Sequence, residues 1–392
     1  YGRRLNAKEK AVRDEVLVIG AGPAGISSAY YLKRAGLPYR VVDRAAVPAS
    51  TWANLYPSLQ LNTAGFVSHL PGERIPLRFG VFPMGRDYYA YLRDYVDHHR
   101  LQIDYGVEVL RVSPGSDGWC VETRRVDAEP HETAIYRAVI IAAGRFGNPV
   151  VPPIPGAFNG RLLHARDFHD PAAFAGRRVL VVGSGPSGVD IAAALADVTP
   201  PVSLAIRNDI VVARKYPYGL PNTAWQILLS PLPPKWRKPL LDRIVYQGYR
   251  DADDIGLKFA PNREDRRGTG APVRGHELID AIRAGKIKPV AGLAALDGDH
   301  AVMDDGQRLA VDTIIFGTGY RPVLDFLDFP YQLDSDGWHI RLDPDTYQVS
   351  GQPGLFVVGW FYRGLGPMHN IRAEARTVVR GIEQLWGRVS RL

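Results

Sequence analysis

The chain has 392 residues, enough for two or three domains that each have a hydrophobic core. Its formal net charge of +7 comes from scattered arginines and lysines, without the run of about five or six like charges that marks a nucleic-acid-binding arm. The single cysteine, Cys120, excludes an internal disulfide and a CxxC redox pair, and the lack of CxxC and HExxH spacings predicts no metal site.

The first predicted element is a nucleotide-binding turn at residues 16–25, VLVIGAGPAG. An apolar strand runs into Gly20, Gly22 and Gly25, and a helix-forming segment follows. The first glycine of such a unit permits the turn, the second lets backbone approach a pyrophosphate, and the third lets the helix pack on the strand. The phosphates then lie at the helix N-terminus. We expect a dinucleotide here, with Pro23 and Ala24 among its contacts.

The next predicted strand, residues 39–43 (YRVVD), supports this reading. It ends at Asp43, 18 residues after Gly25, where an acidic side chain would accept a hydrogen bond from a ribose hydroxyl. Arg44 follows directly. We predict that this first unit binds FAD.

The chain between residues 47 and 76 is rich in turn formers and has weak periodicity, which predicts an irregular segment wrapped around a ligand. Residues 87–100 then place apolar side chains at helical spacing. These predict the core face of a helix: Tyr88, Tyr91, Leu92 and Tyr95. Short antiparallel strands are expected at residues 106–112 and 119–123.

A second nucleotide-binding turn is predicted after a linker. The apolar strand at residues 138–144 ends at Gly144, a small residue suited to close approach to the flavin. Four prolines at residues 148–155 predict the linker. Residues 178–188, RVLVVGSGPSG, then repeat the turn with the residues Gly183, Ser184, Gly185, Ser187 and Gly188.

The coenzyme of the second turn is predicted from its next strand, residues 201–206. In place of an acidic residue this strand is followed by Arg207, a cation suited to the 2′-phosphate of NADP. We therefore predict NADPH in this unit.

Residues 216–267 show no strand pattern and carry leucines and tryptophans among prolines and basic residues. An inserted helical pair packed on the domain is the favoured interpretation. A substrate cover and a membrane-surface helix are the alternatives.

The end of the chain returns to strands. Residues 301–303 and 308–311 predict two strands joined by an Asp-Asp-Gly turn. Residues 354–359 predict a further strand, and residues 371–385 predict a closing helix. The apolar strand at residues 312–320 resembles the strand that ends at Gly144, so we infer that the chain crosses back there to the first domain.

The predicted fold class is therefore α/β, with two Rossmann-like dinucleotide-binding domains. The FAD-binding domain would be discontinuous, at residues 1–160 and 308–392. The NADPH-binding domain, residues 161–307, would be inserted into it.

Two motifs resemble those of a known family. The segment Phe158-x-Gly160-x-x-x-His164-x-x-x-Phe168 resembles the fingerprint FxGxxxHxxx(Y/F) of class B flavin-dependent monooxygenases. Residues 312–320, DTIIFGTGY, are similar to that family's D-xxx-(L/F)-ATGY linker, with glycine in place of alanine. The resemblance covers nearly the whole chain.

Finer matches favour the branch that oxygenates nitrogen or sulfur, and the plant YUCCA-type enzymes. The fingerprint ends in Phe168 and His169, where Baeyer-Villiger enzymes have Trp-Pro. Residues 56–62 resemble the segment that carries the flavin-site asparagine of flavin-containing monooxygenases, here Asn62. Residues 354–365 resemble the YUCCA-type C-terminal signature.

The resemblance implies a reaction. NADPH reduces FAD, dioxygen adds at the flavin C4a carbon to form a hydroperoxide, and one oxygen atom passes to a small-molecule substrate. An amine or thioether would be oxygenated at nitrogen or sulfur, and a 2-oxo acid would be decarboxylated oxidatively. Asn62 is the expected catalytic residue. Further cofactor contacts are implied at Trp52, which follows Ser50 and Thr51 instead of the usual Gly-Gly, and at Leu61, Thr318, Gly319 and Tyr320.

Three other functions stay open at this point: Baeyer-Villiger oxidation of a ketone, a flavin reductase, and a non-catalytic NADPH or flavin sensor. The missing CxxC argues against the dithiol type of reductase. For His164 a structural role at the domain junction is favoured over that of a general base.

The expected partners are a small-molecule substrate and O2, with no nucleic acid and no integral membrane segment. A homodimer is left open as the assembly. We expect a cytoplasmic protein, because a single cysteine suits a reducing compartment and residues 1–14 carry no apolar signal-like run.

Overall fold

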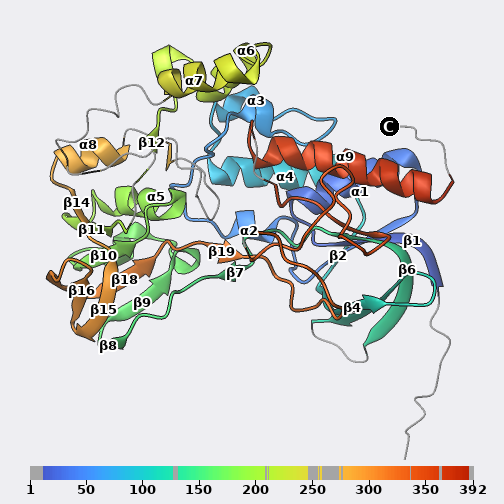
Figure 1. The fold of residues 1–392 in the computed structure, drawn as a ribbon, viewed down its shortest axis with the longest axis horizontal. Coiled ribbons are helices and arrows are strands. Elements are labelled where there is room, and N and C mark those ends of the chain that lie inside the picture. The colour runs from blue at the N-terminus through green and yellow to red at the C-terminus, as the bar shows by residue number, and fades with distance from the viewer. Residues whose placement is uncertain are drawn as a thin grey trace, which may run out of the picture.

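Two α/β units lie side by side in the computed structural model, and each is built on its own sheet (Figure 1). The structure describes residues 12–126, 131–207, 210, 212–245, 255, 257, 273–274, 277–335, 337–361 and 364–387. The predicted α/β class with two Rossmann-like nucleotide-binding units is confirmed.

The first unit contains a seven-stranded sheet. Its strands are β1 (Val12–Ile19), β2 (Tyr39–Asp43), β3 (Ile103–Tyr105), β4 (Val107–Pro114), β5 (Trp119–Arg125), β6 (Glu132–Ile141) and β20 (Leu355–Val357). The order is β3-β2-β1-β6-β5-β4, and β20 pairs in parallel with the end of β6. β1 is parallel to both β2 and β6, whereas β4, β5 and β6 are antiparallel, as predicted for β4 and β5.

Alternate side chains of β1 enter two hydrophobic cores. Val16 and Val18 pack under three helices on one face, α1 (Pro23–Ala35), α4 (Gly85–His98) and α9 (Pro367–Leu385). Leu17 and Ile19 face the opposite core, which includes Phe326 from the C-terminal part of the chain. Because both faces are covered, the strand is apolar throughout.

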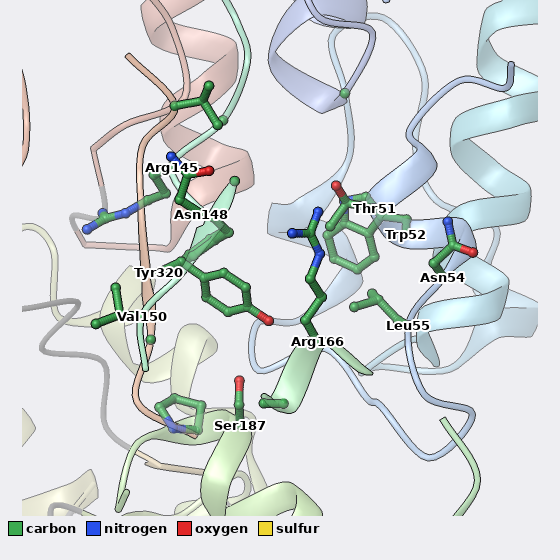
Figure 2. Close-up of a pocket in the computed structure, with 18 of the residues that line it drawn as sticks. Thr51, Trp52, Asn54, Leu55, Arg145, Asn148, Val150, Arg166, Ser187 and Tyr320 are labelled. Atoms are coloured by element: carbon green, nitrogen blue, oxygen red, sulfur yellow. The ribbon is translucent and has the colours of Figure 1, made fainter. Parts of the chain in front are cut away.

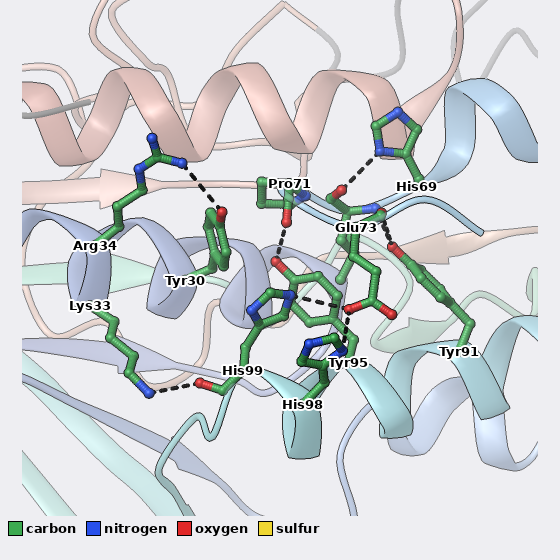
Figure 3. A network of polar contacts seen from close by, with 11 residues as sticks. Tyr30, Lys33, Arg34, His69, Pro71, Glu73, Tyr91, Tyr95, His98 and His99 are labelled. Atoms are coloured by element: carbon green, nitrogen blue, oxygen red, sulfur yellow. Dashed lines mark hydrogen bonds and ion pairs between the residues drawn. The ribbon is translucent and has the colours of Figure 1, made fainter. Parts of the chain in front are cut away.

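The tyrosine face predicted for residues 87–100 lies on α4, and it is both buried and hydrogen-bonded (Figure 3). Tyr95 Oη donates to the carbonyl of Pro71 at 2.5 Å, and Tyr91 Oη donates to the carbonyl of Glu73 at 2.8 Å. The Glu73 carboxylate lies 3.2 Å from a ring nitrogen of both His98 and His99. These contacts fix the irregular chain that follows α3 (Gly65–Ser68) onto α4.

The second unit contains a parallel sheet of order β14-β11-β10-β18-β9. Its strands are β9 (Arg161–His164), β10 (Val179–Val182), β11 (Val202–Ala205), β14 (Ile287–Val290) and β18 (Thr313–Phe316). The helices α5 (Pro186–Leu195) and α8 (Glu277–Arg283) contribute to the core with Val181 and Ile315. The other face of the sheet, with Leu180 and Ile314, packs on a four-stranded sheet made of β8 (Gly156–Phe158), β15 (Leu293–Gly298), β16 (His300–Met303) and β17 (Arg308–Ala310).

The predicted domain boundaries at residues 160 and 308 do not match this division of the sheets. β8 already pairs with β15 in the second unit, and β18 pairs with β9 and β10 there. The inferred crossing at residues 312–320 is therefore wrong for the strand itself, and the chain returns to the first unit after β18. An apolar strand that ends in glycine is typical of any central parallel strand, so its pattern does not tell which sheet it joins.

Short elements complete the described structure. They are α2 (Ser50–Ala53), η1 (Leu77–Phe79), β7 (Asn148–Pro149), η2 (Ala165–Asp167), η3 (Pro171–Phe174), β12 (Val212–Ala213), η4 (Pro217–Gly219), α6 (Asn222–Leu228), α7 (Pro234–Val245), β13 (Val273–Arg274) and β19 (Tyr320–Arg321). Two helices, α6 and α7, lie within the segment for which a helical pair was predicted, and most of residues 246–267 lie outside the described residues. No helix among the described residues has the length and apolar character needed to cross a membrane.

The tightest backbone packing in the first unit predicts a stability effect. A Cβ atom on Gly25 would lie 1.8 Å from the carbonyl oxygen of Gly20, whereas a Cβ on Gly22 would meet nothing within 4 Å. Gly25→Ala must displace backbone, so we expect it to lower the free energy of unfolding by about 1–3 kcal/mol or more. In the flavin-free proteins, Gly22→Ala is the matched control and should change it little. Thermal unfolding of both variants measures the difference, and equal melting temperatures would contradict the packing.

Candidate active site

One large cavity of about 1980 Å³ lies between the two units. Pockets for single small ligands commonly measure roughly 300–1,000 Å³, so this cavity has room for more than one large ligand. Its wall includes the loops after β1, β2 and β6 and those after β10, β11 and β18. In α/β sheets, ligands bind outside the carboxyl ends of the strands.

The start of α1 presents unsatisfied backbone donors to the cavity. Its N-cap residue is Gly22, with no side-chain hydrogen bond to the first turn, and Gly20, Gly22, Pro23 and Ala24 all line the cavity. Because a Cβ on Gly22 would meet nothing within 4 Å, that side of the backbone is open to a ligand. Uncapped N–H groups and the helix dipole favour a phosphate at this place. The site fits the pyrophosphate of FAD.

Asp43 connects this turn to the next strand. Its carboxylate accepts hydrogen bonds from the backbone N–H groups of Ala21 at 2.6 Å and of Ala45 at 2.8 Å. A carboxylate has about four acceptor positions, so two stay available for the ribose hydroxyls that the sequence predicts. Asp43 and the exposed Arg44 both line the cavity.

The rest of the predicted flavin site lines the same cavity. Trp52 on α2 packs against Tyr88 with ring centroids 4.6 Å apart. Leu61 is buried, and its backbone N–H donates to the carbonyl of Pro83 at 2.9 Å. Trp52, Leu61, Asn62 and Gly144 are all on the cavity wall.

The second turn repeats the first around α5. Gly185 is the N-cap, again without a side-chain hydrogen bond, and a Cβ there would meet nothing within 4 Å. Gly183, Ser184, Gly185 and Ser187 line the cavity. Arg207 follows β11, is exposed, and also lines it. These residues fit a second dinucleotide with a 2′-phosphate.

Two predicted cofactor contacts, Gly25 and Gly188, are not on the cavity wall. Cβ atoms on them would lie 1.8 Å and 2.0 Å from the carbonyl oxygens of Gly20 and Gly183. The third glycine of each turn therefore acts through packing beneath the first glycine, without facing a ligand.

His164 holds the junction between the units. Its Nε2–H donates to the carbonyl of Gly319 at 3.1 Å, and its Nδ1 accepts the backbone N–H of Arg166 at 3.2 Å. Burial lowers its pKa, so the ring is neutral at pH 7, in agreement with the expected structural role. Its ring packs edge-on against Tyr320, with centroids 4.8 Å apart.

The segment that contains Thr318, Gly319 and Tyr320 forms the cavity wall at this junction. Thr318 Oγ1 donates to the carbonyl of Val150, and β19 pairs with β7 in the preceding linker. Burial raises the pKa of Tyr320, so its hydroxyl stays a hydrogen-bond donor at neutral pH. Figure 2 shows this hydroxyl directed into the cavity.

Sequence reasoning missed two arginines on the cavity wall. Arg166, on η2 just after β9, lies between Tyr320 and Trp52, and Arg145 lies beside Asn148 (Figure 2). Arg166 occupies a variable position of the FxGxxxHxxxF segment, which explains why the motif did not indicate it. No ion pair or side-chain hydrogen bond joins its guanidinium to another residue in the described part of the chain.

A third missed group is the pair formed by Tyr56 and Asp190. Tyr56 Oη donates to Asp190 Oδ2 at 3.1 Å and so joins the irregular segment of the first unit to α5. Burial raises the pKa of Asp190 to about 6, although the Tyr56 hydrogen bond and Lys215 oppose the shift. Only the folded structure brings these distant residues together.

The described residues of the cavity wall include no cysteine. Among the residues that the structure describes, no group of three or more His, Cys, Asp or Glu side chains is arranged to hold a metal ion. Cys120 lies on β5, away from the residues that line the cavity.

The open side of Gly22 predicts a selective loss of flavin. Gly22→Val has room in the protein alone, but its methyl groups would occupy the approach to the pyrophosphate. We expect the purified variant to fold with less than roughly a tenth of the wild-type FAD content. The matched variant Gly185→Val should keep FAD and lose affinity for NADPH. Absorbance at the flavin band gives occupancy, and full occupancy in Gly22→Val would refute the assignment.

Arg207 predicts the choice of coenzyme. Hydrogen bonds to charged groups contribute about 1.5–3 kcal/mol each, so Arg207→Ala should raise the Michaelis constant for NADPH by roughly tenfold to somewhat over a hundredfold. The constant for NADH should barely change, because NADH lacks the 2′-phosphate. Flavin reduction with each coenzyme measures both constants. An equal loss for the two would mean that Arg207 supports the fold instead.

Comparison with known proteins supports the same reading. Residues 17–220 match the family model described as pyridine nucleotide-disulphide oxidoreductase. A probable indole-3-pyruvate monooxygenase, YUCCA8 of Arabidopsis thaliana, is 27% identical over 94% of this chain and 89% of its own length. The rice (Oryza sativa) indole-3-pyruvate monooxygenase YUCCA8 is 29% identical over 92% of this chain and 89% of its own.

A solved structure agrees over the full fold. The flavin-containing monooxygenase from Stenotrophomonas maltophilia superimposes with a TM-score of 0.72 and 25% identity, over 95% of this chain and 98% of that one. The agreement spans both nucleotide units. The chain therefore belongs to the pyridine nucleotide-disulphide oxidoreductase family and, within it, is a class B flavin monooxygenase of the YUCCA and flavin-containing monooxygenase type that uses FAD and NADPH.

Proposed function

We propose that this monooxygenase acts on a small molecule with a carboxylate group, and that its reaction is the oxidative decarboxylation of a 2-oxo acid. The balanced reaction takes a 2-oxo acid, O2, NADPH and a proton to the carboxylic acid one carbon shorter, CO2, water and NADP⁺. Its YUCCA relatives bear the name of indole-3-pyruvate monooxygenases, and indole-3-pyruvate is such an acid. Oxygenation of nitrogen or sulfur is the second candidate.

The observation that carries this proposal is the position of Arg166. Its guanidinium lies in the cavity between Trp52 and Tyr320 (Figure 2), and its positive charge acts to lower the pKa of Tyr320 against the effect of burial. A guanidinium and a neutral phenol hydroxyl together offer several donors to one carboxylate. A neutral amine or thioether would leave the arginine without such a partner.

The residues that line the cavity would have separate roles in the reaction. When bound, FAD supplies the chemistry that activates dioxygen after reduction by NADPH. The uncapped N-termini of α1 and α5 would bind the two pyrophosphates. Asp43 would accept hydrogen bonds from the ribose hydroxyls of FAD, and Arg207 would bind the 2′-phosphate of NADPH. We place Asn62 as a hydrogen-bonding residue beside the flavin. Trp52 and Leu61 would keep water away from the reacting atoms.

We also propose a homodimer and a cytoplasmic location, the latter because a single cysteine suits a reducing compartment.

The proposal predicts that Arg166 discriminates between substrates. Arg166→Ala should lower kcat/KM for a 2-oxo acid by roughly tenfold to a hundredfold, because one or two charge-assisted hydrogen bonds are lost. Arg166→Lys should retain part of this kcat/KM, because lysine keeps the positive charge but lacks the paired N–H donors of the guanidinium. Turnover of a neutral thioether should stay the same in all three proteins.

Oxygen uptake with NADPH, together with mass spectrometry of products, measures these values. No NADPH-dependent turnover of any 2-oxo acid would contradict the proposed reaction. An equal loss for acid and thioether would mean that Arg166 binds the coenzyme and not the substrate.

A further inference from the structure

Exposed apolar side chains are concentrated on α6 and α7, on the chain just before α6 and in the connection between the two helices, outside the cavity. Eight of the 18 exposed large hydrophobic residues among those described fall within residues 216–240, each 38–64% exposed. They form what is here termed the α6–α7 patch: Tyr216, Tyr218, Leu220, Ile227, Leu228, Leu232, Trp236 and Leu240. None of them lines the cavity, so the patch is not part of the active site.

The patch continues onto the first unit. The ring of Tyr216 packs edge-on against Phe82, with centroids 5.1 Å apart, so the two segments are in contact. Leu77 and Val81 in the chain before Phe82 are exposed, as is Phe66 on α3. Figure 1 shows α6 and α7 above α3 at one edge of the molecule, on the side away from β8 and β9.

Basic side chains stand among the apolar ones. α7 carries exposed Lys235, Lys238 and Arg243 and the partly exposed Arg237, against the single acid Asp242. The Lys235 ammonium lies 5.9 Å from the centre of the Trp236 ring. On the neighbouring segment the Arg78 guanidinium lies 4.8 Å from the ring of Phe79.

The combination of exposed apolar and basic side chains indicates a lipid surface as the binding partner. Exposed apolar patches of this kind usually mark an interaction site. A protein interface would deplete lysine at its centre, whereas a helix that lies on a membrane combines tryptophan and leucine with surrounding lysine and arginine. Long basic side chains can extend to lipid phosphates while tryptophan and tyrosine rings settle at the headgroup level.

We propose that the α6–α7 patch docks this protein on an anionic phospholipid surface as a peripheral membrane protein. The apolar side chains enter the interface, and the cations of α7 pair with acidic headgroups. The attachment is reversible and weakens with salt, because part of it is electrostatic.

Vesicle binding tests the proposal with the full-length, FAD-loaded protein. Large vesicles of phosphatidylcholine with about a third phosphatidylserine are compared with vesicles of phosphatidylcholine alone. Three variants are compared with wild type: Trp236→Ser, the double change Lys235→Gln with Lys238→Gln, and Leu162→Ser. Leu162 is the matched control, because it is 47% exposed on β9, far from the patch. Flavin content and NADPH oxidation without vesicles show that each variant is folded.

We expect the wild-type protein to bind the acidic vesicles, and we expect Trp236→Ser to lower this affinity at least about tenfold. The affinity for acidic vesicles should fall by roughly fivefold for each lysine removed, and it should decrease in high salt. Leu162→Ser should bind as the wild type does. Binding that is absent at every composition would overturn the proposal, and so would an equal loss in Leu162→Ser. Concentration-dependent self-association that Trp236→Ser abolishes, without vesicle binding, would also overturn it and assign the patch to a second copy of the chain.

Discussion

The close approach of two backbone segments within each glycine turn is the constraint on which the site depends. In both units the third glycine sits so near the first that a Cβ atom would lie 2.0 Å or less from its carbonyl oxygen. This contact seats α1 and α5 directly behind their strands and aims both helix N-termini at the cleft. Two anion-binding sites of the same construction then face a single cavity.

Contacts at the junction between the two units fix how the N-termini of α1 and α5 are oriented toward each other across the cavity. His164, kept neutral by burial, bridges the end of β9 to Gly319, and β7 pairs with β19 across the crossing of the chain. Tyr56 reaches from the first unit to Asp190 on α5. These contacts hold Tyr320 and Arg166 on the cavity wall between the two nucleotide turns, so the junction residues position the two side chains that we propose as substrate contacts.

Much of the fold and of the cofactor site could be predicted from the sequence, because glycine spacing and apolar runs are local signals. The strands that end at Asp43 and near Gly144 and the tyrosine face of α4 lie where the patterns indicate, and most of the residues expected to contact a cofactor line the cavity. The membership of β18 in the second sheet could not be read, since its composition suits a central strand of either sheet. Arg166 and the Tyr56–Asp190 pair could not be found either, because long-range contacts alone give them their place.

As a flavin monooxygenase, this chain transfers one atom of dioxygen to a small-molecule substrate at the expense of NADPH. Turnover of a 2-oxo acid under ¹⁸O2 in ordinary water, with the product weighed by mass spectrometry, tests it most directly. We expect one ¹⁸O atom in each carboxylic acid product and one NADPH consumed per product formed. NADPH oxidation that yields only hydrogen peroxide with every substrate, or product without the label, would contradict it.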